Sequence, residues 1–183
     1  MQLLQAIDTR SSALRLTGPG PDRADLERIL TAGVRAPDHG RLAPWRFRVL
    51  RGDARHVLGE ALAGFTQRTK PDATADQIEA ARAKALRAPV VVVVAARTVA
   101  VPKVPEIEQL LAVGAAVQNM CLAAHALGFG AMWKTGAPTC DAGVVRALGL
   151  EAGDRIVAFL YLGNVQAPGP VRPAVLDGCV RWD

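Results

Sequence analysis

The sequence has few cysteines, few aromatic residues and no long apolar run. Three cysteines in 183 residues are too few for a disulfide-stapled domain, so we expect reduced thiols. The longest unbroken apolar stretch, Ala88–Ala96, is far short of the roughly 20 residues of a membrane-spanning helix. Met1–Asp8 has no cationic start and reaches an acid before any apolar core, unlike a secretory signal. We therefore expect a soluble cytoplasmic protein.

The composition indicates one globular domain. Hydrophobic residues make up 50% of the chain and charged residues 21%, so residues 1–183 can bury one sizeable core. The 17 glycines and 12 prolines show no period, which excludes a collagen-like protein. The net charge of +5 favours anionic small-molecule partners at least as much as nucleic acid. A nucleic-acid module would need a basic run with interleaved aromatic residues, and the nearest candidate, Arg41–Arg51, is better interpreted as a loop followed by a strand.

Several familiar site motifs are missing. No pair of Cys or His residues has the spacing of zinc ligands, and no P-loop or Gly-x-Ser-x-Gly turn is present. Gly128-Phe129-Gly130 closes a predicted helix and opens a strand, which is the reverse of a dinucleotide-binding turn. We predict no metal site; the residues considered for one were Cys121, Cys140, Cys179, His39, His56 and His125.

Periodicity and turn residues predict an α+β fold with about four strands. The predicted helices are a short N-terminal one, 22–36, 53–69, 74–87, 105–127 and 141–148. The predicted strands are 46–51 with one buried face, the central valine run 90–94, 129–134 and 156–162. Residues 163–183 carry three prolines and are expected to be extended.

The longest predicted helix, Pro105–Leu127, has small residues in its middle: Ala112, Gly114, Ala115 and Ala116. Small side chains permit another helix to approach closely, so this helix is expected at a dimer interface or along the core axis.

Three stretches carry polar groups that a core does not explain. Arg10-Ser11-Ser12, with Arg15, combines a guanidinium with hydroxyls at the end of the first helix, a donor set suited to a phosphate monoester. The alternative is a solvated helix end. Ala36–Trp45 is a loop stiffened by prolines that could present backbone groups to a planar ligand. Within it, His39 could equally be a surface residue and Trp45 a core anchor.

The third stretch is Trp133-Lys134-Thr135-Gly136, where a strand ends in an aromatic ring, a cation, a hydroxyl and a glycine that admits close backbone approach. An ordinary strand-to-loop exit is the alternative.

Together and in this order, the three stretches resemble the FMN-dependent nitroreductase family, in particular its short, YdjA-like branch. The resemblance covers about residues 5–165. It also includes Arg35-Ala36-Pro37-Asp38-His39, Lys103-Val104-Pro105, Leu127-Gly128-Phe129-Gly130 and Phe159-Leu160-Tyr161-Leu162-Gly163.

The resemblance implies a homodimer with two FMN sites at the subunit interface, on a mainly antiparallel sheet flanked by helices. Arg10, Ser11 and Ser12 would hold the phosphate and ribityl end, and Arg35 and His39 would reach the same flavin from the partner chain. Trp133, Lys134, Thr135 and Gly136 would line the isoalloxazine. The tail, 164–183, would embrace the other subunit. A stretch at the end of the long helix would bind the nicotinamide cofactor: Ala123, Ala124, His125, Ala126, Leu127 and Gly128.

The chain also departs from the family's opening, Arg-Arg-Ser-x-Arg-x-Phe. Ser11 replaces the second arginine, and Leu14 stands where the third is expected, one place before Arg15. Larger relatives carry an Asn near the position of Arg41 and a basic pair near the C-terminus, for which Arg172 is a possible substitute. These departures bear on the tightness of FMN binding.

The reaction implied is ping-pong hydride transfer from NADH or NADPH, through N5 of FMN, to a nitroaromatic or quinone-like acceptor. Backbone amides of residues 133–136 and the charge of Lys134 would stabilise the reduced flavin. No side chain is expected to act as an essential acid or base. The alternatives are a flavin-binding protein without turnover, and a different flavin reaction such as dehydrogenation or dehalogenation on the same scaffold.

Overall fold

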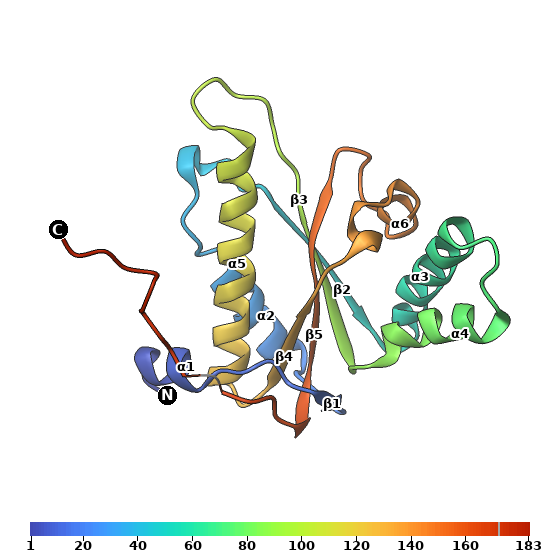
Figure 1. The fold of residues 1–183 in the computed structure, drawn as a ribbon, viewed down its shortest axis with the longest axis horizontal. Coiled ribbons are helices and arrows are strands. Elements are labelled where there is room, and N and C mark those ends of the chain that lie inside the picture. The colour runs from blue at the N-terminus through green and yellow to red at the C-terminus, as the bar shows by residue number, and fades with distance from the viewer. Residues whose placement is uncertain (172) are drawn as a thin grey trace.

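A computed structural model describes residues 1–171 and 173–183. An antiparallel sheet separates two helical layers (Figure 1). The strands run in the order β1-β5-β3-β2, and β4 also pairs with β5. Their bounds are β1 Arg15–Thr17, β2 Trp45–Arg51, β3 Val90–Ala96, β4 Gly130–Lys134 and β5 Arg155–Ala167. The helices are α1 Leu3–Thr9, α2 Arg23–Gly33, α3 Arg55–Thr69, α4 Ala75–Ala83, α5 Glu106–Ala126 and α6 Ala142–Ala147.

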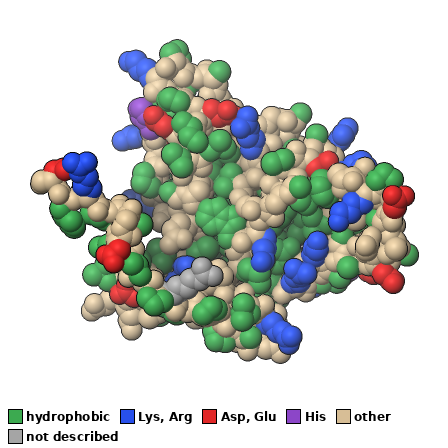
Figure 2. Space-filling model, viewed as in Figure 1, with side chains coloured by type: hydrophobic (Ala, Val, Ile, Leu, Met, Phe, Trp, Pro, Cys, Tyr) green, Lys and Arg blue, Asp and Glu red, His purple; other side chains and the backbone are tan. Residues whose placement is uncertain are grey.

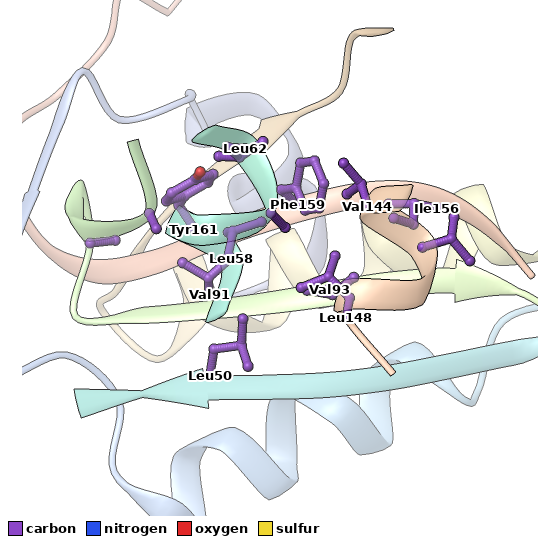
Figure 3. Close-up of a cluster of buried hydrophobic side chains, with 14 of the residues drawn as sticks. Leu50, Leu58, Leu62, Val91, Val93, Val144, Leu148, Ile156, Phe159 and Tyr161 are labelled. Carbon is purple, nitrogen blue, oxygen red and sulfur yellow. The ribbon is translucent and has the colours of Figure 1, made fainter. Parts of the chain in front are cut away.

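The valine run is the centre of the sheet, as its β-branched sequence predicts. β3 pairs with β2 on one side and β5 on the other, and every residue of β3 is fully buried. Because side chains alternate along a strand, the valines divide between two cores. Val91 and Val93 pack with α3 and α6, a cluster shown in Figure 3. Val90, Val92 and Val94 pack with α2 and α5 on the opposite face.

Side-chain caps begin α2, α4 and α6. The Asp22 carboxylate accepts from the Asp25 N–H at 2.9 Å, and Asp141 accepts from the Val144 N–H at 2.8 Å. Thr74 and Gln77 form a reciprocal capping box at the start of α4. Each bond satisfies a backbone donor that the first helical turn leaves unpaired.

Several predicted boundaries are wrong. The described sheet has five strands, one more than the expected number of about four, because Arg15, expected at the end of the first helix, begins β1. The extended tail was predicted to begin at Gly163, but β5 continues to Ala167. Leu16 and Thr17 of β1 pair with this last part of the strand. A strand as short as β1 is too brief to show a period in the sequence.

A 3₁₀ turn also precedes α3, and another follows α4. The helix expected from Asp53 begins at Arg55, after the turn Gly52–Ala54, and the Ala-rich helix ends at Ala83 before the turn Lys84–Leu86. β2 was expected to bury one face, but Leu50 packs into one core while Phe47 and Val49 pack against the other.

α5 is the one described helix long and apolar enough to cross a membrane by length and composition. Its buried side packs on the sheet, where Val113, Val117, Met120 and Ala124 have no exposed surface. This arrangement is that of a core helix.

Candidate functional site

The segment after α1 is fixed against the sheet by backbone hydrogen bonds. Arg10 ends the helix by donating its N–H to the Ala6 carbonyl at 3.0 Å. The Ala13 N–H then donates to Ala131 of β4 at 3.1 Å, and the Leu14 N–H to Ala167 of β5 at 2.9 Å. Arg10, Ser11 and Ser12 are thereby held against the sheet beside β4.

A groove of about 930 Å³ lies between this segment and the C-terminal tail. Its lining residues are Ile7, Asp8, Arg10, Ser11, Ser12, Leu14, Pro170, Val171, Pro173 and Ala174. The tail lies directly on the segment at Gly169, where a Cβ would stand only 2.1 Å from the Ser12 carbonyl oxygen. Gly169 therefore permits the close approach of the tail next to the groove, and the sequence analysis missed it, although a glycine between two prolines is a recognisable signal. Arg172 lies outside the described residues.

The donors of this groove are available to a ligand. Among the described residues, the guanidinium of Arg10 and the hydroxyls of Ser11 and Ser12 have no hydrogen-bond or ion-pair partner. Asp8 is the one acidic residue of the lining. Burial raises the pKa of the Cys121 thiol on α5 to about 11, and the positive charge of Arg10 opposes that shift. One guanidinium and two hydroxyls are a donor set that fits a phosphate monoester such as that of FMN.

The proline-bounded loop is shaped by its own backbone. Asp38 accepts from the Ala43 N–H at 2.7 Å, and Gly40, Arg41 and Ala43 have positive φ angles of 75°, 53° and 46°. Left-handed geometry in residues other than glycine is costly and is typical of functional sites. Nδ1 of His39 lies 2.6 Å from Oε2 of Glu108 on α5. Both side chains are exposed, so His39 remains open to a partner.

Trp45 and Arg35 flank this loop in different settings. Trp45 packs against the core on the α2–α5 face, which confirms the core-anchor alternative. Arg35 follows α2 and is exposed, and its side chain has no ion-pair partner among the described residues.

The end of β4 presents backbone donors. Nε1 of Trp133 donates to the Val157 carbonyl at 3.1 Å, which orients the half-exposed ring. Lys134 and Thr135 are exposed, and the turn at Gly136 has φ 116°. Within the described chain, the N–H groups of Thr135 and Gly136 have no acceptor. These free donors are a place where a planar polar ligand could bind.

The Arg10 part and the His39 part of the predicted site lie at opposite ends of α5. Oγ1 of Thr9, next to Arg10, lies 2.9 Å from Nε2 of His125 near the end of α5, whereas His39 contacts Glu108 in its first turn. At 1.5 Å rise per residue, these anchor points are about 26 Å apart along the helix. One chain therefore does not bring Arg10 and His39 to the same small ligand.

The predicted nicotinamide stretch lies at the Arg10 end of α5. Ala124 has no exposed surface and Ala123 and Leu127 pack against the same core, while His125 faces Thr9. Gly128 stops the helix with φ 88°, and Ala126 is exposed. Among the described residues, no group of three or more His, Cys, Asp or Glu is arranged to hold a metal ion. All three cysteines are free thiols.

Comparison with known proteins decides the family. A profile of the nitroreductase family matches residues 7–164. The chain belongs to the nitroreductase family. It is 40% identical over 166 residues to the provisionally named NAD(P)H nitroreductase YdjA of Escherichia coli K12. The aligned region covers 91% of this chain and 90% of YdjA. A provisionally named NAD(P)H nitroreductase of Haemophilus influenzae is 35% identical over 165 residues, 90% of this chain and 89% of its own.

Solved structures show the same fold. A nitroreductase-like protein of Bacillus cereus superposes with a TM-score of 0.86 at 24% identity, over 100% of this chain and 96% of its own. A nitroreductase of Desulfovibrio desulfuricans in complex with FMN superposes with a TM-score of 0.77 at 29% identity, over 100% and 97%. The fold and family predicted from the sequence are confirmed, and the chain is an oxidoreductase by family.

Proposed function

We propose that this protein is an FMN-dependent NAD(P)H oxidoreductase that reduces nitroaromatic or quinone-like acceptors by ping-pong hydride transfer. The observation that carries the proposal is the unpartnered donor set of Arg10, Ser11 and Ser12 beside a groove of about 930 Å³. Relatives that share the fold support it, since one neighbour holds FMN and the similar curated proteins are named NAD(P)H nitroreductases.

In this proposal, FMN is held by two groups of residues, one from each subunit. Arg10, Ser11 and Ser12 bind the phosphate and ribityl end through charge-assisted and hydroxyl hydrogen bonds. The N–H groups of Thr135 and Gly136, free of protein acceptors within the described chain, donate to the polar edge of the ring system beside Trp133. Arg35 and His39 reach the same flavin from the other subunit.

The separation along α5 makes the site incomplete without a second copy. His39 is anchored about 26 Å from Thr9 along the helix, so its contribution to a flavin at Arg10 has to come from another chain. α5 offers a contact face: Ile107 and Leu111 are exposed, and a Cβ at Gly114 would meet only open space. We infer a homodimer whose two sites are each built from both chains.

The tail supports the same assembly. The C-terminal segment runs outward past α1, away from its own sheet (Figure 1). It carries Val175, Leu176 and Trp182, whose exposed fractions are 65%, 65% and 86%. Apolar side chains in an extended tail are stabilised by packing against another surface, which fits the expected embrace of the partner subunit.

The protein's part in the chemistry is binding and electrostatics. FMN, when bound, supplies the hydride chemistry between NADH or NADPH and the electron-poor acceptor. In this proposal Lys134 adds positive charge where negative charge develops, and the N–H groups of residues 135 and 136, which have no acceptor within the described chain, donate to the same region. No side chain is assigned as an essential acid or base. A cytoplasmic location and the nicotinamide contacts of residues 123–128 belong to the proposal.

Steady-state kinetics test this function. FMN-loaded protein should oxidise NADPH or NADH in the presence of a nitroaromatic or quinone, with parallel double-reciprocal lines. Bound FMN that neither dinucleotide reduces within seconds would contradict turnover and favour a flavin-binding role. Reduction of the flavin without any consumption of these acceptors would favour a different flavin reaction.

A further inference from the structure

A second pocket lies on the other side of Leu14 from the Arg10–Ser12 groove. It has a volume of about 420 Å³, within the range of small-molecule sites. It is formed where β1, β4 and the turn before β3 meet, and its lining residues are Leu14, Arg15, Leu16, Leu86, Arg87, Met132, Lys134 and Gln166. Neither the comparisons nor the family resemblance assigns this pocket a ligand.

The pocket holds three positive charges and no acidic residue. Among the described residues, the side chains of Arg15, Arg87 and Lys134 have no carboxylate within ion-pair distance and no hydrogen-bond partner. Elsewhere in the described chain seven arginines are paired with carboxylates, as Arg82 is with Glu60 and Glu79. Figure 2 shows Lys and Arg side chains gathered below and to the right of the centre of one face, with no Asp or Glu among them.

Uncompensated cations that share one pocket repel one another, and an anion relieves that repulsion. Arginine also offers a planar fork that matches a carboxylate or phosphate bidentately. The remaining wall is mostly apolar, with Leu14, Leu86 and Met132, and Gln166 is its one uncharged polar residue. A ligand that satisfies both parts has an anionic group on an apolar or aromatic body.

The pocket is next to the proposed flavin site because two residues belong to both. Leu14 also lines the Arg10–Ser12 groove, and Lys134 belongs to the stretch 133–136 proposed to line the isoalloxazine. A molecule in the pocket would therefore lie beside the ring system, where the electron acceptor has to bind.

We propose that Arg15, Arg87 and Lys134 form an acceptor subsite that selects aromatic acceptors bearing an anionic group, such as a carboxylate. This inference rests on the proposed function and names the substrate class of that same site.

The test compares 4-nitrobenzoate with its neutral analogue 4-nitrobenzamide on FMN-loaded protein. The Arg87→Ala variant removes one pocket cation, and Lys84→Ala, three residues earlier and outside the pocket lining, removes the same charge as a matched control. We expect Arg87→Ala to lower the ratio of the two kcat/KM values, benzoate over benzamide, about tenfold. Lys84→Ala should change that ratio less than twofold. Comparing each variant's ratio with that of the wild type cancels the difference in intrinsic reactivity between the two compounds.

Calorimetric titration with 4-nitrobenzoate gives a readout that needs no turnover. Wild-type holoprotein should bind it, and Arg87→Ala and Arg15→Ala should each weaken binding about tenfold. Equal losses for both compounds, or unchanged binding in both variants, would overturn the subsite. Binding to the FMN-free protein that FMN abolishes would assign the pocket to the flavin instead. Measurable binding without any reduction would retain the subsite and reject the proposed function.

Discussion

Replacing Arg10 by alanine should weaken FMN binding strongly. Arg10 is half-buried at the end of α1, lines the groove with Ser11 and Ser12, and has no carboxylate partner in the described chain. Removing it breaks no ion pair there, so the fold should be little affected. A hydrogen bond to a charged group contributes about 1.5–3 kcal/mol. The loss corresponds to an increase in the FMN Kd of about 10- to 150-fold.

Fluorescence titration of FMN with apoprotein measures this Kd. Arg10→Lys keeps the charge but loses the planar fork, so its Kd should lie between those of wild type and Arg10→Ala. Arg23→Ala is the control, because Arg23 is exposed on α2 and pairs with Glu27. An unchanged Kd in Arg10→Ala, with the fold intact by circular dichroism, would refute the assignment of the groove as the phosphate site.

Three further predictions follow from the packing and the ion pairs. Leu111→Asp should place a charge in the inferred dimer contact, giving a monomer by light scattering with weakened FMN binding; a dimer that persists would contradict the interface. Asp154, buried and bonded by Arg97 at 2.7 and 2.9 Å, has a pKa held below its ordinary value chiefly by that hydrogen bond. Its ionised form therefore stabilises the fold above about pH 4, and the contribution is lost as the pH falls through the lowered pKa. Asp154→Asn should cost about 1.5–3 kcal/mol at neutral pH and flatten the acid limb of a urea-denaturation pH series; an unaltered limb would refute this. Leu160→Ala, at a site with no exposed surface, should lower the free energy of unfolding by about 2–5 kcal/mol in urea, and a loss under 1 kcal/mol would show that the core relaxes around it.

The strongly periodic parts of the sequence predicted the fold well. The valine run of β3 and the apolar stripe of α5 produce elements close to the expected ones, because burial on both faces of a strand and on one stripe of a helix leaves a direct mark in the sequence. β1 could not be predicted, since its three residues are strand only through pairing with β5, about 150 residues away in the chain.

Residue types in the sequence pointed to the candidate site, but its geometry could not be predicted. The Arg10–Ser12 donors and the end of β4 were found from their residue types, and the structure places them with free donors. The separation of His39 from Arg10 along α5 depends on tertiary contacts that no local pattern encodes. Arg87 was missed for the same reason, because only the meeting of β1, β4 and the turn before β3 makes it part of a pocket.

The central claim is that two copies of this chain bind FMN, and the visible absorbance spectrum of the protein purified without added cofactor tests it most directly. We predict a yellow protein that releases FMN on heating, close to one per subunit. A colourless protein that also fails to bind FMN on reconstitution would contradict the account and leave the family relationship as ancestry without the cofactor.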